Sequence, residues 1–255
     1  MAGYAITSGS DNVAVGSNAL VANTSGTRNI AIGYKAYDGA DTENDNIAIG
    51  YDALGGAVNG GEFNVAVGNY SMDALTSGDK NTGVGYNALT ALSTGSWNTV
   101  VGYEAGKAMT TGADNTAIGL SAGAAITSGT RNVAIGGVAL DNADGENDNL
   151  AIGYAALGGA INGGEYNVAI GNYSMDALTT ADENTAVGYN AMTGATSGFN
   201  NTALGKDAME SLTQGSHNVA IGNDAGDAIA SGQQNVVIGS GADVNDEAAI
   251  NQIVI

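Results

Sequence analysis

The 255-residue sequence has no cysteine, no proline and only six lysine and arginine residues. Without cysteine the chain cannot form a disulfide framework or a thiolate metal site. Six scattered cations cannot make the basic stripe that nucleic-acid binding requires. An anionic membrane surface would repel a formal net charge of −20, and no apolar run is long enough to span a bilayer. We therefore expect no nucleic-acid partner and no membrane insertion.

Aromatic residues are also scarce, at 5% of the chain, whereas glycine occurs 41 times. A composition rich in glycine, alanine, asparagine and threonine is compatible with disorder. The hydrophobic content of 44%, however, includes valine and isoleucine at fixed intervals. β-Branched residues in such an arrangement are typical of packed strands. The composition therefore favours an ordered, repetitive β protein.

A short repeat runs through the whole chain, and we number its positions from the asparagine that opens each copy. Twelve of the fourteen intervals between copies are 17 residues long and two are 18. Each of the two longer copies carries a single inserted residue. The opening residues are Asn12, Asn29, Asn46, Asn64, Asn81, Asn98, Asn115, Asn132, Asn149, Asn167, Asn184, Asn201, Asn218, Asn235 and, in the last copy, Gln252.

A second, longer period is superimposed on the short one. The segment NIAIGYDALGGAVNGGEFNVAVGNYSMDAL begins at Asn46, and the near-identical NLAIGYAALGGAINGGEYNVAIGNYSMDAL begins 103 residues later at Asn149. This match indicates duplication of a block of six repeats, roughly residues 23–125 and 126–228. We predict a single repeat domain over residues 1–255.

Each copy of the repeat has the same pattern of residue types. Position 1 is asparagine, positions 2 and 4 are mostly valine, isoleucine or threonine, position 3 is mostly alanine, and position 5 is glycine in all fourteen complete copies. Positions 2 to 4 therefore predict a short strand with position 3 on the opposite face from positions 2 and 4. The glycine at position 5 permits a positive φ or a tight corner. Position 8 is alanine or serine, which predicts a narrow interior.

The rest of the repeat would complete one coil of a solenoid. Positions 8 to 12 could supply a second strand, and a T-[ST]-G turn at positions 13 to 15 would close the coil. Stacked copies would bury their apolar faces collectively, and the asparagines would form an amide ladder. We predict an all-β, parallel β-solenoid of about fifteen turns of 17 residues. A helix-rich repeat is the alternative, which the invariant glycine and the β-branched residues disfavour.

The motif N-[VT]-A-[VI]-G, with a small residue three positions after the glycine, resembles the head domains of trimeric autotransporter adhesins and the repeat regions of phage tail fibres. The resemblance covers essentially the whole chain. It implies a left-handed parallel β-roll and a side-by-side homotrimer. The longer repeat of this chain is more similar to the phage fibres, and residues 239–255 resemble segments that precede a stalk or partner domain. The structural positions that carry the motif are represented by Asn132, Val133, Ala134, Ile135, Gly136 and Ala139.

Few residues have the types and spacing of a chemical site. No nucleophile motif, phosphate-binding loop or dinucleotide fingerprint is present, and the only histidine, His217, lies in a variable turn position. We therefore predict no enzyme activity. Exposed tyrosines at position 6 could bind a glycan or contact a neighbouring chain; they are Tyr34, Tyr51, Tyr86, Tyr103, Tyr154 and Tyr189.

Two acidic clusters are candidate calcium sites, because alternating oxygen ligands in a turn suit Ca²⁺. No other cofactor is expected. Since the clusters are 103 residues apart, duplication alone explains the second copy. The residues are Asp41, Glu43 and Asp45 in the first cluster and Asp144, Glu146 and Asp148 in the second.

The pattern favours a structural or adhesive fibre or spike module, on a phage virion, outside the cell or on a cell surface, for attachment or decoration. We expect self-association as a homotrimer, with small residues at positions 3 and 8 allowing close packing, and with a host-surface glycan as a candidate receptor. Neither end shows the polar cap of a solenoid, which favours a piece of a longer fibre, covered ends or head-to-tail assembly. The alternatives are a self-assembling extracellular filament subunit and a monomeric surface- or ice-binding solenoid. An ice-binding surface would need a threonine array that is only partial here.

Overall fold

The computed structural model describes residues 1–255. Each repeat contributes one strand at positions 2 to 4, as predicted. The strands are three residues long, and the last has two. Their bounds are β1 (Val13–Val15), β2 (Ile30–Ile32), β3 (Ile47–Ile49), β4 (Val65–Val67), β5 (Thr82–Val84), β6 (Thr99–Val101), β7 (Thr116–Ile118), β8 (Val133–Ile135), β9 (Leu150–Ile152), β10 (Val168–Ile170), β11 (Thr185–Val187), β12 (Thr202–Leu204), β13 (Val219–Ile221), β14 (Val236–Ile238) and β15 (Ile253–Val254).

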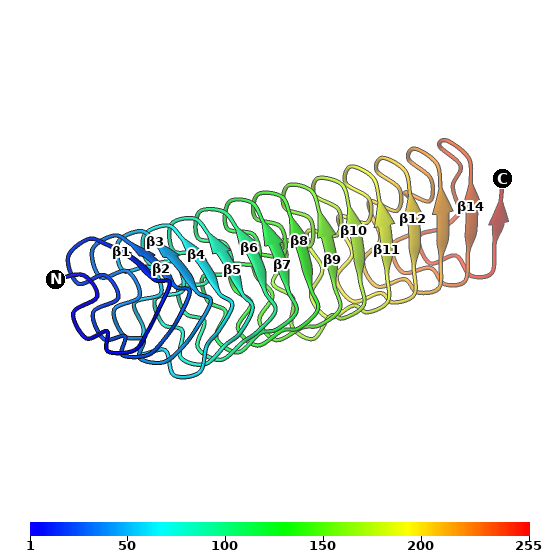
Figure 1. The fold of residues 1–255 in the computed structure, drawn as a ribbon. Helices are drawn as coiled ribbons and strands as arrows, with labels where there is room; N and C mark the ends of the chain where they lie inside the picture. Colours follow the sequence, from blue (N-terminus) through cyan, green and yellow to red (C-terminus); the bar gives the residue numbers. More distant parts are fainter. The chain divides into compact units, whose positions relative to one another are not determined.

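The chain divides into two compact units, residues 1–130 with β1 to β7 and residues 131–255 with β8 to β15. Within each unit, every strand pairs in parallel with the strand of the next repeat (Figure 1). The register is constant, so that Val65, Thr82 and Thr99 lie in one column. Each unit is therefore a parallel β-solenoid, which confirms the predicted all-β fold class.

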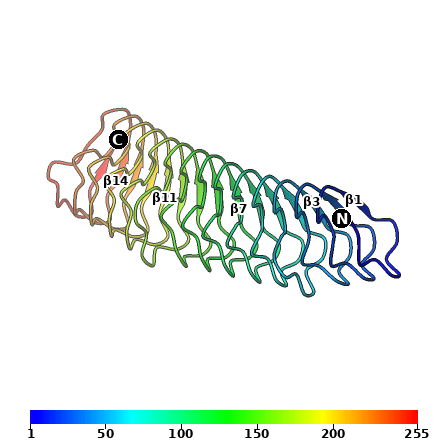
Figure 2. The same cartoon turned by 90° about the vertical axis from the view of Figure 1, so that its left-hand side faces the viewer.

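The chain at positions 8 to 12 forms no second strand, contrary to our prediction. Figure 2 shows loops between the strands of successive repeats. Residues at positions 7 and 9 adopt the left-handed backbone conformation, as Asn87 (φ 53°) and Leu89 (φ 54°) do, and such residues cannot continue an extended strand. Their amides still pair with the neighbouring repeats: Asn87 N donates to Asn69 O (3.1 Å) and Leu89 N to Ala105 O (3.1 Å). The turns are therefore stacked like the strands.

The interior of each unit is filled by side chains from positions 3, 8, 9 and 12. The side chains at positions 3 and 8, such as Ala48 and Ala53, are fully buried, as the small residue type predicted for position 8. In some repeats a small residue at position 9 or 12 accompanies a large one at the other position. Gly106 at position 9 accompanies Met109 at position 12, whereas the large Tyr37 accompanies Ala40. These buried side chains keep the interior filled while the individual residues vary.

The asparagines at position 1 form the predicted amide ladder. Asn64 Oδ1 accepts hydrogen bonds from the backbone N (3.0 Å) and the Nδ2 (3.1 Å) of Asn81 in the next repeat. Asn64 Nδ2 donates to the carbonyl of Gly78 (2.9 Å), in the T-[ST]-G turn of the same repeat. One buried amide therefore ties the start of a strand to the turn that closes its coil and to the next coil. This double role explains why no other residue occupies position 1 in the fourteen complete repeats.

Glycine at position 5 is required by both conformation and space. Gly85 has φ +140°, and a Cβ there would clash with the carbonyl oxygen of Gly102 in the next repeat. The predicted tight corner is therefore confirmed. The structure contains no helix, and so none that could cross a membrane.

Candidate functional site

The outer face of the strands, which we call the strand face, consists of the side chains at positions 2 and 4. Because position 3 points inwards, these neighbours point outwards. Val15 is 56% exposed, Ile32 37% and Leu204 47%. In-register pairing arranges these side chains in two straight columns within each unit. The strand face is therefore largely apolar and rich in β-branched side chains, with threonine at position 2 of β5, β6, β7, β11 and β12.

The strand face carries no charge. No aspartate, glutamate, lysine or arginine occurs at positions 1 to 5 of any repeat. Apolar patches that persist on a folded surface commonly mark contacts with other molecules. We had expected small residues at positions 3 and 8 to let chains pack closely. The structure corrects this: those side chains are buried within their own coil, so within the strands only positions 2 and 4 face outwards.

Tyrosine rings form a column beside the strand face of the first unit. The ring centroids of Tyr34 and Tyr51 lie 5.3 Å apart with planes at 19°, and those of Tyr86 and Tyr103 lie 5.3 Å apart at 15°. The predicted position 6 tyrosines of this unit are therefore brought together in pairs. In the second unit, Tyr154 and Tyr189 belong to a shorter column of the same kind.

Our sequence analysis missed the rings that join these tyrosines. Tyr70 contacts Tyr51 at 5.2 Å and Tyr86 at 6.1 Å, both edge to face. It lies at position 7 because Asn69 occupies position 6, where its Oδ1 accepts a hydrogen bond from the backbone N of Tyr51 (3.0 Å). Tyr173 is its duplicate in the second unit. The recurring Asn-Tyr pair was the signal that could have revealed both rings.

The stacked rings remain partly accessible to solvent. Tyr34, Tyr86 and Tyr103 are between 42% and 52% exposed. In the stacked pairs, each ring covers part of its neighbour's face, which is an arrangement that aromatic rings prefer. The columns therefore combine ring-to-ring contact with an exposed surface.

Two phenols in the first column have perturbed acidities. Partial burial and the neighbouring tyrosines raise the pKa of Tyr70. The carboxylate of Glu104 raises the pKa of Tyr103. Both phenols therefore stay protonated to a higher pH than an ordinary tyrosine.

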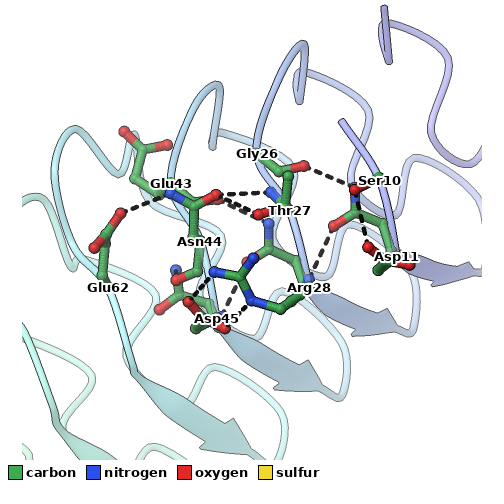
Figure 3. Close-up of polar contacts among 12 residues, drawn as sticks. Ser10, Asp11, Gly26, Thr27, Arg28, Glu43, Asn44, Asp45 and Glu62 are labelled. Atoms are coloured by element: carbon green, nitrogen blue, oxygen red, sulfur yellow. Dashed lines mark hydrogen bonds and ion pairs between the residues drawn. The ribbon is translucent and has the colours of Figure 1, made fainter. Parts of the chain in front are cut away.

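The first predicted calcium cluster is dispersed among separate partners (Figure 3). Arg28 donates from Nε to Asp45 Oδ1 and from Nη2 to Asp45 Oδ2, both at 2.6 Å. This bidentate pair lowers the pKa of Asp45. Asp41 accepts a hydrogen bond from the hydroxyl of Thr24. In the second cluster, Asp148 is paired with Arg131 in the same way, at 2.7 Å.

Glu43, the central residue of the cluster, is almost fully buried. Its Oε2 accepts hydrogen bonds from the backbone N of Asp41 (2.9 Å) and of Thr42 (3.0 Å), and its Oε1 accepts one from Gly60 N (3.0 Å). Glu146 does the same in the second unit, where Asp144 N (2.7 Å) and Gly163 N (2.9 Å) donate. These oxygens are occupied by amide donors that belong to the fold.

The calcium prediction is corrected accordingly. The structure has no group of three or more histidine, aspartate or glutamate side chains arranged to hold a metal ion. The acidic residues of each cluster lie close in sequence, but each one is directed to a different neighbour. The lone His217 is exposed, and its ring packs edge to face on Phe199 at 5.2 Å.

No protein-family model matches this chain, and no curated protein sequence matches it. The fold and its surface define the class: a parallel β-solenoid repeat protein with an uncharged apolar strand face and tyrosine columns beside it. The adhesin-like and fibre-like character implied by the motif is therefore a proposal.

Proposed function

We propose that this chain is a non-enzymatic structural module of a fibre or spike, which associates side by side with copies of itself through the strand face. The strand face is the single observation that carries the proposal. It is a continuous apolar surface within each unit of a chain with a net charge of −20. The setting we propose is a virion, the extracellular space or a cell surface, and the motif favours three copies.

The distribution of charge supports a second copy as the partner. The carboxylates of this chain lie outside positions 1 to 5, so contact through most other surfaces brings like charges together. Contact through the strand face buries valine, isoleucine and threonine instead. Interface cores are depleted of charged residues in the same way. The strand face is therefore the surface on which copies associate with least electrostatic repulsion.

The tyrosine columns support the same arrangement. They follow position 4 by two or three residues in the sequence, and most of their side chains are exposed. Tyrosine is enriched at protein interfaces because it combines a large apolar ring with a polar tip. In the assembly we propose, the columns form the polar rim of the interface. A host-surface glycan is the receptor class we propose for the assembled fibre.

Mass in solution tests the proposal. We expect light scattering after size exclusion to give a mass of three chains that is stable on dilution. Ile49→Glu, which places a charge in the middle of the strand face, should yield single chains. Thr94→Glu is the matched control, because Thr94 is exposed in the T-[ST]-G turn, and it should leave the mass unchanged.

Other outcomes separate the alternatives. A single-chain mass for the natural sequence at every concentration would refute side-by-side assembly and favour a monomeric surface-binding solenoid. Mass that grows with concentration would favour a filament subunit. If the three-chain form is found, its binding to an array of cell-surface glycans tests the attachment role.

A further inference from the structure

Eight of the eleven tyrosines belong to the two columns. In the first unit, five rings follow one another with centroid separations of 5.2 to 6.1 Å. In the second unit, Tyr154, Tyr173 and Tyr189 are separated by 5.6 and 5.9 Å. Each contact joins two successive repeats. Each phenol ring of the columns is therefore in contact with another phenol ring of the same chain.

The three remaining tyrosines are differently placed. Tyr4 and Tyr166 are 75% and 55% exposed, and neither makes any of these ring contacts. Tyr37 is fully buried and its hydroxyl accepts a hydrogen bond from Asn46 Nδ2 (2.6 Å). The reactivity of stacked, isolated and buried phenols can thus be compared within one molecule.

We propose that the tyrosine columns are sites of oxidative cross-linking, in which neighbouring rings of one chain are joined as dityrosine. The co-reactant is a one-electron oxidant, such as a haem peroxidase with hydrogen peroxide. The proposal is independent of the assembly proposed above, because both partners in each link belong to the same chain.

The reaction balances as follows. Each of two phenols loses one electron and one proton to give a tyrosyl radical. The two radicals share their electrons in a new carbon–carbon bond between ring carbons ortho to the hydroxyls. The two hydrogens on those carbons then shift to the oxygens and restore both phenols. Overall, two tyrosines and one hydrogen peroxide give one dityrosine and two waters.

The fold makes coupling within the chain the favoured outcome. A radical formed on an isolated phenol must meet a second radical by diffusion. A radical in a column already contacts the neighbouring ring, and the two couple as soon as that ring is oxidised. The parallel pairing of β4, β5 and β6 holds successive repeats in fixed register. Each link covalently fastens one coil to the next and closes a loop of the unfolded chain, so we expect the cross-linked protein to unfold at a higher temperature.

The sequence allows the links to be located by tryptic digestion. Cleavage after the six cations gives fragments that include residues 1–28 with Tyr4, 29–35 with Tyr34, 36–80 with Tyr51, Tyr70 and the buried Tyr37, and 81–107 with Tyr86 and Tyr103. After treatment of the dilute full chain with peroxidase and hydrogen peroxide, we expect fragment 36–80 joined to 81–107 and to 29–35. Each joined species should have lost two hydrogens, and the sample should show dityrosine fluorescence.

Matched variants test whether the column directs the reaction. Trp97→Phe is the background, since it removes the only tryptophan from fragment 81–107. In this background Tyr70→Phe keeps the ring packing but should abolish the link between 36–80 and 81–107, while the link to 29–35 remains. Tyr166→Phe, which removes an isolated exposed phenol, should change neither link.

Three results would overturn the proposal. One is the absence of dityrosine under conditions that cross-link a tyrosine-rich control protein. Another is that Tyr4, in fragment 1–28, forms dityrosine links in the same yield as the column tyrosines. The third is links that lie between chains, shown by doubled mass in denaturing gels and by a yield that rises with protein concentration.

Discussion

The carboxylate of Glu43 replaces hydrogen bonds that other repeats make through their backbone. In a regular repeat, Thr24 N (2.9 Å) and Ser25 N (3.2 Å) donate to the carbonyl of Asp41 in the following repeat. The repeat after Glu43 is one residue longer, and there Asp41 N and Thr42 N donate to the Glu43 side chain instead. The buried glutamate is therefore the local compensation for the inserted residue, and the duplicated block preserves both features in Glu146.

This role predicts a specific loss of stability. Glu43→Gln retains the size of the side chain but turns an amide NH₂ towards backbone N–H groups. We expect it to lower the free energy of unfolding by about 1–3 kcal/mol, the cost of leaving a buried donor unpaired. Chemical denaturation measures the change in the free energy of unfolding. Faster hydrogen exchange at the amides of Asp41, Thr42 and Gly60 would show that the loss is local. Glu247→Gln, at an exposed side chain, should change stability by less than about 0.5 kcal/mol; an equal effect of both variants would refute this assignment.

At the scale of the elements, the turns between strands hold carboxylates that are partly withdrawn from water. Burial raises the pKa of Asp73, although the hydroxyl of Thr90 in the next repeat donates to its Oδ1 (2.6 Å) and opposes that shift. Burial likewise raises the pKa of Asp38 and of Asp141. The charged form of these groups is therefore less favourable in the folded state than in the unfolded chain.

The sign of the pH dependence follows from this direction. A raised folded-state pKa gives stability that is complete below the unfolded value of 3.8 and is lost as pH rises through the folded value. We expect Asp73→Asn to unfold at a higher temperature than the natural protein at pH 7, and the difference to disappear as pH approaches 4. Melting curves at several pH values measure this. A difference that is independent of pH would show that the charge of Asp73 is not its cause.

For the whole molecule, net charge and apolar surface act in opposite directions. The charge of −20 keeps copies apart, whereas the strand face favours their contact. Salt screens repulsion between exposed charges, with a screening length of about 10 Å at 0.1 M. In the assembly we propose, the balance between these two effects would set the conditions under which copies associate.

This balance predicts that association strengthens with ionic strength. Raising the sodium chloride concentration from roughly 10 mM to roughly 500 mM shortens the screening length severalfold and should shift the dilution midpoint of the assembled form to lower protein concentration. Light scattering over a dilution series at each salt concentration measures the shift. An assembly that dissociates in high salt would be held together by ion pairs, and the strand face would then not be its interface.

From the residue pattern alone, we could predict the repeat, the strands at positions 2 to 4, the asparagine ladder, the glycine corner and the inward direction of position 8. These features are local, and each recurs often enough for its physical cause to be recognised in the pattern of residue types. The prediction of a second strand at positions 8 to 12 was wrong. Residues with a left-handed backbone, such as Leu89, produce turns there, although their side chains are as apolar as those of a strand.

The contacts that variable side chains make between repeats could be seen only in the folded chain. The fold placed Tyr70, at repeat position 7, between Tyr51 and Tyr86, which are both at position 6. It also directed Glu43 to backbone amides and Asp45 to Arg28, which separated a predicted metal site. Stacking joins residues 16 to 19 positions apart in the chain, and the partner of each side chain depends on the path of the neighbouring coil, which one repeat taken alone does not specify.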